Sequence, residues 1–362
     1  MVKRSRVRRP ATKRRAKTAA PAAGPVSLNE ARALARAKKP KLAVKAARAT
    51  LAPPTPAAVG EERERLREEQ RADRARRIRD YKATMEIMKQ RGARPPRSKG
   101  GAKPKGGKVK AKAAAFAPLQ IFAEGDSWFK YPPFILNGGI IPRLESRLGV
   151  PILNLAKAGD EVRYMLGVEE RAILAEQFTN GCPAGGPWDV LLFSGGGNDI
   201  VDNPMALWVK DFDANVPPAS LINQPRFDAA LTLVRAGYED LITLRDNLSP
   251  TTHLIFQGYD FAIPDGRGVC RLGPWLKPTF DLRNFPTRAA AQAVVKAMLQ
   301  QFAAVLTALA QRPRVTFING QGTLTPQPAS WHNELHPNQA GFDAFADLFH
   351  VKLKQLFPSR VA

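Results

Sequence analysis

The sequence predicts an α/β protein built on a five-stranded parallel sheet, and two observations support this fold class. Five short apolar runs, each flanked by Gly, Pro or Asn, have the character of strands buried on both faces: residues 119–123, 152–155, 190–194, 253–257 and 315–318. Longer helical patterns lie between and after them, at residues 142–148, 161–177, 227–247, 289–311 and 338–356. This alternation predicts helices on both faces of the sheet.

Charge divides the chain into two unlike parts. Residues 1–115 contain 35 Lys and Arg against 9 Asp and Glu, a net charge of +26. Residues 116–362 contain 21 against 23, a net charge of −2. The second part is large enough to enclose one sizeable core, so we predict a globular domain at 116–362 and a basic extension at 1–115.

The extension is rich in Ala, Lys, Arg and Pro and has few large apolar residues, which predicts that most of it is disordered. Ser27 and Glu30 have the spacing of a capping box, and a charged helix is expected at 61–90. A 3-4-3 spacing relates four of its residues, Ile78, Tyr81, Met85 and Met88. The favoured interpretation is a solvated helix, and the alternatives are a coiled coil or a docking stripe.

Compartment and membrane association are only weakly indicated. No run reaches the roughly 18 apolar residues of a membrane span, and the basic start lacks the apolar core of a secretion signal. Cys182 and Cys270 match neither a metal spacing nor a disulfide framework. We therefore expect a cytoplasmic, reducing location, while the Arg-rich start also resembles an organelle transit peptide.

Four polar motifs follow or precede predicted elements in a consistent order. The first, Gly125-Asp126-Ser127-Trp128, directly follows the first strand. Ligands of open α/β sheets bind outside the carboxyl ends of the strands, where a neighbouring base can activate an exposed Ser. Taken alone, the motif is also compatible with an ordinary turn.

The other three motifs lie after the second and third strands and before the last helix. The first of them, Asn154–Asp160, contains Gly159, whose backbone N–H can serve as a donor, and a plain strand-to-helix turn is the alternative interpretation. Three glycines precede Asn198, without the residues of a P-loop or the spacing of a dinucleotide fingerprint. His336-Pro337 lies in a loop, with Asn338 as the expected N-cap of the last helix.

Together these motifs resemble the four blocks of the SGNH (GDSL-type) hydrolases over roughly residues 116–357. The usual alternative serine-hydrolase motif, G-x-S-x-G, is absent. The resemblance implies a flavodoxin-like three-layer α/β/α sandwich and a serine esterase or lipase that requires no metal or organic cofactor. It also implies a small-molecule or lipid ester as the substrate.

The resemblance further implies a role for each block. Ser127 would be the nucleophile and His336 its base. The oxyanion hole would consist of the backbone N–H groups of Ser127 and Gly159 and the side-chain amide of Asn198. Donors already aimed at a developing oxyanion stabilise it without reorganisation.

One position departs from the family pattern. The family places Asp three residues before the catalytic His, and this chain has Asn333 there. An amide can orient the imidazole but cannot stabilise the imidazolium by charge. Glu334 is the alternative acid, and a more distant acid is a third option. The His332–His336 spacing is compatible with a metal only on a helix, which Pro337 and the lack of a third ligand disfavour.

The substrate pocket is expected beside a long segment, residues 258–285, rich in Gly, Pro and aromatics. We expect Trp128, Tyr259 and Asp260 to line it, and Phe129, Tyr131 and Phe134 to add aromatic surface near the nucleophile. Such walls favour an acyl or aryl group, and ordinary core packing is the alternative interpretation.

Two classes of function remain open at this point. The first is a serine ester hydrolase that acts through an acyl-enzyme. The second is a catalytically idle protein of the same fold whose basic residues 1–115 bind nucleic acid or another polyanion, with an affinity that falls steeply with salt. A solubilising or targeting extension would account equally well for the charge.

Overall fold

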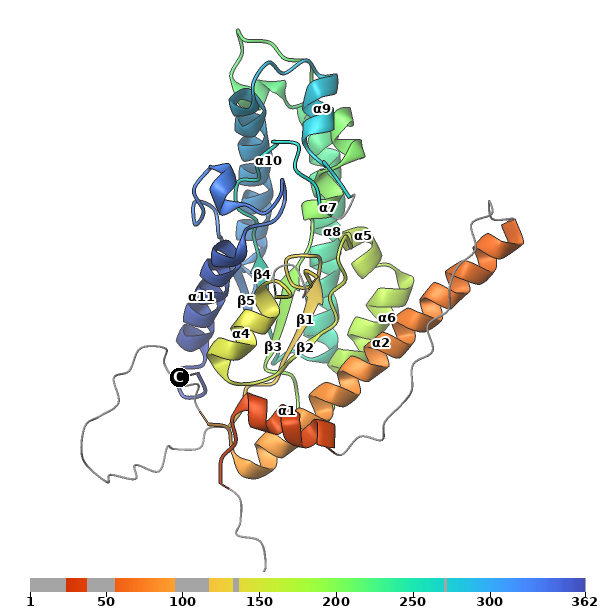
Figure 1. Cartoon of the computed structure of the whole chain (residues 1–362), viewed down its shortest axis with the longest axis vertical. Coiled ribbons are helices and arrows are strands. Elements are labelled where there is room, and N and C mark those ends of the chain that lie inside the picture. Colours follow the sequence, from red (N-terminus) through yellow and green to blue (C-terminus); the bar gives the residue numbers. More distant parts are fainter. Residues whose placement is uncertain (1–23, 38–55, 95–116, 133–136, 270–271, 362) are drawn as a thin grey trace, which may run out of the picture.

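The computed structural model describes residues 24–37, 56–94, 117–132, 137–269 and 272–361. It contains a five-stranded, all-parallel sheet in the order β2-β1-β3-β4-β5 (Figure 1). The strands are β1 (Ile121–Gly125), β2 (Ile152–Asn154), β3 (Val190–Ser194), β4 (His253–Gln257) and β5 (Val315–Ile318). The predicted flavodoxin-like α/β fold is confirmed, and β3, β4 and β5 have the predicted bounds.

Helices cover both faces of the sheet (Figure 1). On one face α4 (Ile140–Leu148) packs against α11 (Gln339–Leu356), and the other face carries α5, α6, α8 and α10. The bounds of these four are Val162–Met165, Val168–Asn180, Gln224–Leu248 and Arg288–Leu309. The single helix predicted at 161–177 is therefore wrong, because extended backbone at Gly167 separates α5 from α6.

The sequence patterns did not predict several short helices that follow strands. They are α7 (Gly197–Ile200), η1 (Asn203–Leu207), η2 (Pro218–Leu221), α9 (Lys277–Leu282) and η3 (Pro328–Ser330). Helices of one turn are too short to show a hydrophobic period, and Pro at the first or second position of four of them reads as a loop signal. Figure 1 shows α9 well beyond the carboxyl end of the sheet, and α9 contacts η1.

Helix α10 is the apolar core helix of its face. Within the part of the chain that the structure describes, it is the one helix whose length and composition would allow it to cross a membrane. Its sequence is interrupted by Gln292, Lys296, Gln300 and Gln301, so it contains no run of about 18 apolar residues. Nine of its residues are buried against the rest of the protein, which is the ordinary pattern of a core helix.

Two helices precede the predicted domain. Helix α1 (Leu28–Ala37) begins with the predicted capping box, in which Glu30 N–H donates to the Ser27 hydroxyl at 3.3 Å and Ser27 N–H to the Glu30 carboxylate at 2.7 Å. Helix α2 (Pro56–Arg91) includes the predicted helix at 61–90 and starts five residues earlier. The predictions for residues 1–23, 38–55 and 95–116 concern residues outside those described.

The second half of α2 packs on the predicted domain. Tyr81, Met85 and Met88 are buried, and the Tyr81 ring centroid lies 5.5 Å from that of Trp188. The favoured interpretation of α2 as a solvated helix is therefore wrong for this half, and the docking stripe is the correct alternative. In the first half of α2, by contrast, residues 64–72 are exposed, and that half projects away from the sheet (Figure 1). Packing thus crosses the proposed boundary at residue 116, and the division of the chain into 1–115 and 116–362 stays a prediction.

Candidate active site

The candidate site lies where the strand order reverses, at the carboxyl ends of β1 and β3. Ser127 follows β1, and Asn198 follows β3. The ends of these strands approach closely: a Cβ on Gly125, whose φ is +156°, would lie 2.6 Å from the Ser194 carbonyl oxygen. Only Gly fits there, so the predicted small-residue turn brings Ser127 to the crevice in which ligands of this fold class bind.

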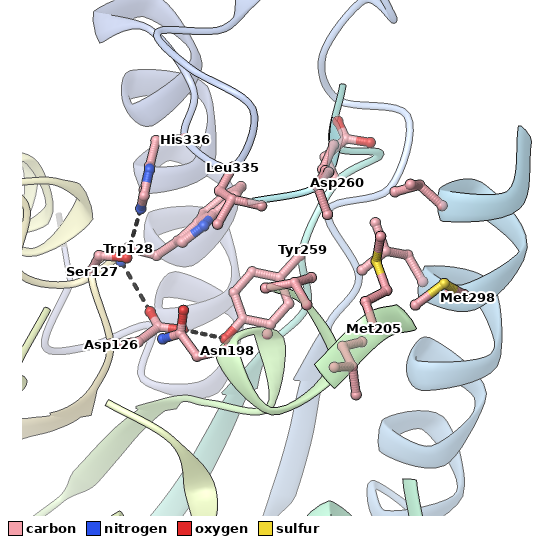
Figure 2. Close-up of a pocket in the computed structure, with 17 residues that line it drawn as sticks. Asp126, Ser127, Trp128, Asn198, Met205, Tyr259, Asp260, Met298, Leu335 and His336 are labelled. Carbon is pink, nitrogen blue, oxygen red and sulfur yellow. Dashed lines mark hydrogen bonds between the residues drawn. The ribbon is translucent and has the colours of Figure 1, made fainter. Parts of the chain in front are cut away.

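Three side chains form a hydrogen-bonded chain at this point. The Oγ of Ser127 lies 2.6 Å from Nε2 of His336, as Figure 2 shows. The Nδ1 of His336 lies 2.9 Å from Oδ1 of Asn333. Since an amide oxygen only accepts, Nδ1 carries the proton, which leaves the Nε2 lone pair directed at the hydroxyl of Ser127.

The orientation of the Asn333 amide is set by its other partners. Its Oδ1 also accepts from the backbone N–H groups of Leu335 and His336, each at 3.0 Å. Its Nδ2 donates to the Tyr131 hydroxyl at 3.0 Å, and the Tyr131 ring centroid lies 4.6 Å from that of His336. Three donors thus converge on the oxygen, so the amide cannot reverse without losing all three.

Burial decides the charge of His336. Desolvation lowers its pKa to about 3, with a smaller contribution from His332. No carboxylate among the described residues hydrogen-bonds to its ring, so nothing close by compensates the cost of the charged form. The imidazole is therefore neutral from weakly acidic pH upward, which is the form that a general base needs.

Glu334, the alternative acid, does not contact His336. Its buried carboxylate accepts four backbone N–H groups at 2.6–3.0 Å, those of Gly266, Trp275, Leu276 and Lys277. These bonds fasten the segment after β4, including the start of α9, to the loop that carries His336. Glu334 therefore has a structural role, and Asn333 is the residue whose side chain hydrogen-bonds to the His336 imidazole.

The three predicted oxyanion donors differ in how far they are already engaged. The backbone N–H groups of Ser127 and Gly159 donate to no other described residue. Asn198 Nδ2 donates to the Asp160 carbonyl at 2.8 Å. Because a primary amide has two N–H bonds, this contact orients Asn198 and leaves its second N–H for a ligand.

A buried network that the sequence analysis missed supports the nucleophile turn. Asp126 accepts from the Trp128 backbone N–H and the Ser194 hydroxyl, each at 2.9 Å, and from the Tyr259 hydroxyl. Burial raises the Asp126 pKa to about 6, and these bonds partly offset that rise. The sequence signal for this network is the position of Asp126 directly before Ser127, because an Asp side chain in a turn commonly accepts a hydrogen bond from the backbone N–H two residues later.

A pocket opens between Ser127 and α10, and the three predicted pocket residues line it. Trp128 and Tyr259 form the wall beside Ser127, as Figure 2 shows. The Asp260 carboxylate accepts from the backbone N–H groups of Phe261, Gly322 and Leu324 at 2.7–2.8 Å, so it joins two loops. The far end is apolar and is lined by Ile200, Val201, Met205, Leu276, Val295, Met298 and Leu299.

The other described residues that the sequence analysis considered for the pocket, a metal site or a disulfide take no part in the Ser–His–Asn chain, except His336. Phe129 is buried against Phe349, whereas Phe134 lies outside the described residues. No group of three metal-binding side chains occurs among the residues described, and the His332–His336 pair is not on one helix. Cys182 is buried beside Tyr81, and Cys270 is not described.

The fold and the site define an α/β protein with a hydrogen-bonded Ser–His–Asn chain at the point where the strand order of its parallel sheet reverses. The sequence model of the GDSL-like lipase/acylhydrolase family matches residues 134–344. The chain belongs to this family and is an ester-bond hydrolase by class. The match includes Gly159, Asn198 and His336 and begins seven residues after Ser127.

Several solved structures of lipases and esterases are similar to part of this chain. A lipase from a goat rumen metagenome is 16% identical, with a TM-score of 0.42 over 64% of this chain and 96% of that one. An extracellular lipase from Streptomyces rimosus gives the same identity and TM-score over 64% and 99%. An acetylxylan esterase from Geobacillus stearothermophilus is 15% identical, with a TM-score of 0.39 over 67% and 96%. A comparison with curated proteins found no significant match. The family assignment rests on the family model.

Proposed function

We propose that this protein hydrolyses carboxylic esters through an acyl-enzyme on Ser127. His336 Nε2 removes the hydroxyl proton as Oγ attacks the ester carbonyl, and the resulting imidazolium returns that proton to the leaving alcohol. Water then attacks the acyl-enzyme, with His336 again as base, and the acid is released. The 2.6 Å contact between Ser127 and a neutral His336 is the observation that carries this proposal.

The oxyanion formed in both steps would be held by Ser127 N–H, Gly159 N–H and the Asn198 amide. In support, the two backbone donors have no other described acceptor, and Asn198 is oriented by the Asp160 carbonyl. Neutral donors suit this task because they are complementary to charge that appears only in the transition state.

Asn198→Ala is expected to lower kcat by about 10²–10³ with little change in KM, because the lost donor acts mainly on the transition state. Steady-state hydrolysis of p-nitrophenyl butyrate measures both constants. Asn203→Ala, at an exposed position at the start of η1, is the matched control and should retain full activity. A change in KM alone at position 198 would contradict the oxyanion role.

The apolar end of the pocket is suited to the acyl group. A carboxylate or sugar there would lose its hydration without gaining partners, whereas a hydrocarbon chain gains about 0.8 kcal/mol for each buried CH₂. We therefore infer a preference for esters of apolar acids of short to medium length, bound between η1 and α10.

Met298→Trp should shorten the acyl chain that the enzyme accepts. Met298 is buried on α10 at the apolar end of the pocket, so a larger ring there competes with the distal methylenes. We expect kcat/KM for p-nitrophenyl hexanoate to fall about 10–100-fold while that for the acetate changes little. Gln300→Trp, exposed on the same helix, is the control. Equal losses for both esters would exclude this acyl pocket.

The proposed activity is tested by supplying the full chain with p-nitrophenyl esters from acetate to octanoate. Hydrolysis of at least one member above the buffer rate is expected, and its absence across the series would contradict the proposal. Polyanion binding through residues 1–115 and a cytoplasmic location stay predictions, supported by the +26 charge and the two isolated cysteines respectively.

A further inference from the structure

We propose that Arg77 of helix α2 is a positioning residue for the oxyanion site, and that α2 is therefore a working part of the catalytic unit. Its target is the segment Asn154–Asp160, here called the Gly159 segment. The kinetic part of this inference rests on the proposed ester hydrolysis. Helix α2 lies before the residues that the family model matches, so the family does not assign it a role.

Arg77 binds the Gly159 segment at the open edge of the sheet. Strand β2 is an edge strand of three residues, so its outer carbonyls have no neighbouring strand. Arg77 Nη1 donates to the Asn154 carbonyl at 3.0 Å and to the Ala156 carbonyl at 3.2 Å. The Arg77 side chain is 21% exposed, and its Nη2 pairs with the Asp73 carboxylate. A planar guanidinium can hold two backbone oxygens and a carboxylate at once, which a single ammonium does poorly.

Two further links join α2 to the same region. Arg74 lies 3.0 Å from the Glu170 carboxylate, which also pairs with Lys157 of the Gly159 segment. Lys130, three residues after the nucleophile, lies 3.6 Å from Asp73. These pairs are partly buried, so solvent screens them less than it screens the pairs on the exposed half of α2.

Helix α2 is itself firmly anchored, as a positioning element must be. The Tyr81 hydroxyl lies 3.6 Å from Cys182 Sγ, and Lys89 donates to the Ala184 carbonyl at 3.1 Å. Through α1, Arg32 pairs at 2.6 Å with Glu145, whose carboxylate also accepts the Ile152 N–H at 2.8 Å. The N-terminal helices are thus linked to both ends of β2, through Glu145 at Ile152 and directly by Arg77 at Asn154.

The Gly159 segment carries two parts of the proposed oxyanion hole. One is the Gly159 N–H, and the other is the Asp160 carbonyl that orients Asn198. Gly159 has a φ of +78°, and a Cβ there would meet no atom within 4 Å, so the space on that side of the residue is open. A displacement of the segment would therefore move two donors together, and a shift of about 1 Å in a catalytic group can cost about 10² in rate.

Arg77→Ala, Arg77→Lys and the control Arg71→Ala, all in the full chain, test this inference. Arg71 is exposed on the same helix and lies near Glu64 of that helix, without contact to the Gly159 segment. For each variant, kcat is measured per site titrated with a fluorophosphonate, well below its thermal midpoint, so that unfolded protein is not counted. Hydrogen exchange of the backbone N–H groups of residues 155–160 provides a readout independent of activity.

Arg77→Ala is expected to lower kcat per titrated site about 10–100-fold with little change in KM and to speed exchange in the Gly159 segment. Arg77→Lys should recover part of both effects, and Arg71→Ala should match the parent. Unchanged kcat and exchange in Arg77→Ala would overturn the inference, as would a loss of thermal stability alone. If the parent hydrolyses no ester, the proposed function fails, and the exchange measurement still decides whether Arg77 holds the segment.

Discussion

Ser127→Ala should lower kcat for ester hydrolysis by about 10⁴–10⁶, because the attacking oxygen is lost and only the donors and the pocket remain. Among the described residues the Ser127 hydroxyl hydrogen-bonds to His336 alone, so the fold should be unaffected. Steady-state kinetics on p-nitrophenyl butyrate, with circular dichroism as the check on folding, measure the effect.

The control for this change is Ser146→Ala. Ser146 is exposed on α4 and donates to the Pro142 carbonyl, so the same hydroxyl is removed far from the site. This variant should be as active as the parent. Activity of Ser127→Ala within about tenfold of the parent would mean that another group attacks the ester, and the assignment of the nucleophile would be wrong.

Asn333→Asp should move the acid limb of the kcat/KM profile upward by about 1–3 pH units. A carboxylate beside Nδ1 favours the imidazolium, so the His336 pKa rises from about 3. The base must be neutral to act, so kcat/KM is lost below that pKa: the parent should stay active down to about pH 4, whereas the Asp variant should lose activity at a pH between about 4 and 6. At pH 8 the Asp variant should have the higher kcat, because its charge stabilises the imidazolium formed during attack.

Asn333→Ala complements this experiment, since it removes the group that orients the ring and should lower kcat at every pH by about 10²–10³. Glu334→Gln should leave the acid limb where the parent has it, because that carboxylate contacts backbone N–H groups of another segment and not the ring. A shift of the limb in Glu334→Gln, with none in Asn333→Asp, would transfer the role to Glu334.

The parallel sheet and the approach of the four motifs could be predicted because both depend on local patterns and one topological rule. Apolar runs such as Val190–Ser194 identify buried strands without reference to their neighbours. Once the strands are parallel, the segments after β1 and β3 must meet at one edge, which brings Ser127 near Asn198. Asn333 lies beside His336 because the two are only three positions apart in one loop.

The contacts that escaped prediction join segments far apart in the sequence. Glu334 receives its partners from residues 57–68 positions away, so spacing alone left it as an alternative acid. The many Arg and Glu residues of α2 favour a solvated helix and outnumber its stripe of only four apolar residues, and the partner of that stripe, Trp188, comes about a hundred residues later. The apolar pocket combines α7, η1 and α10, two of which are too short to show a period.

The central claim, that Ser127 is a nucleophile activated by His336, is tested most directly by mass spectrometry after reaction with a fluorophosphonate. The parent should gain one phosphonyl group, and peptide mapping should place it on the peptide that contains Ser127. His336→Ala should react much more slowly, and Ser127→Ala should gain nothing. A parent that stays unlabelled, or an adduct on a different residue, would contradict the account.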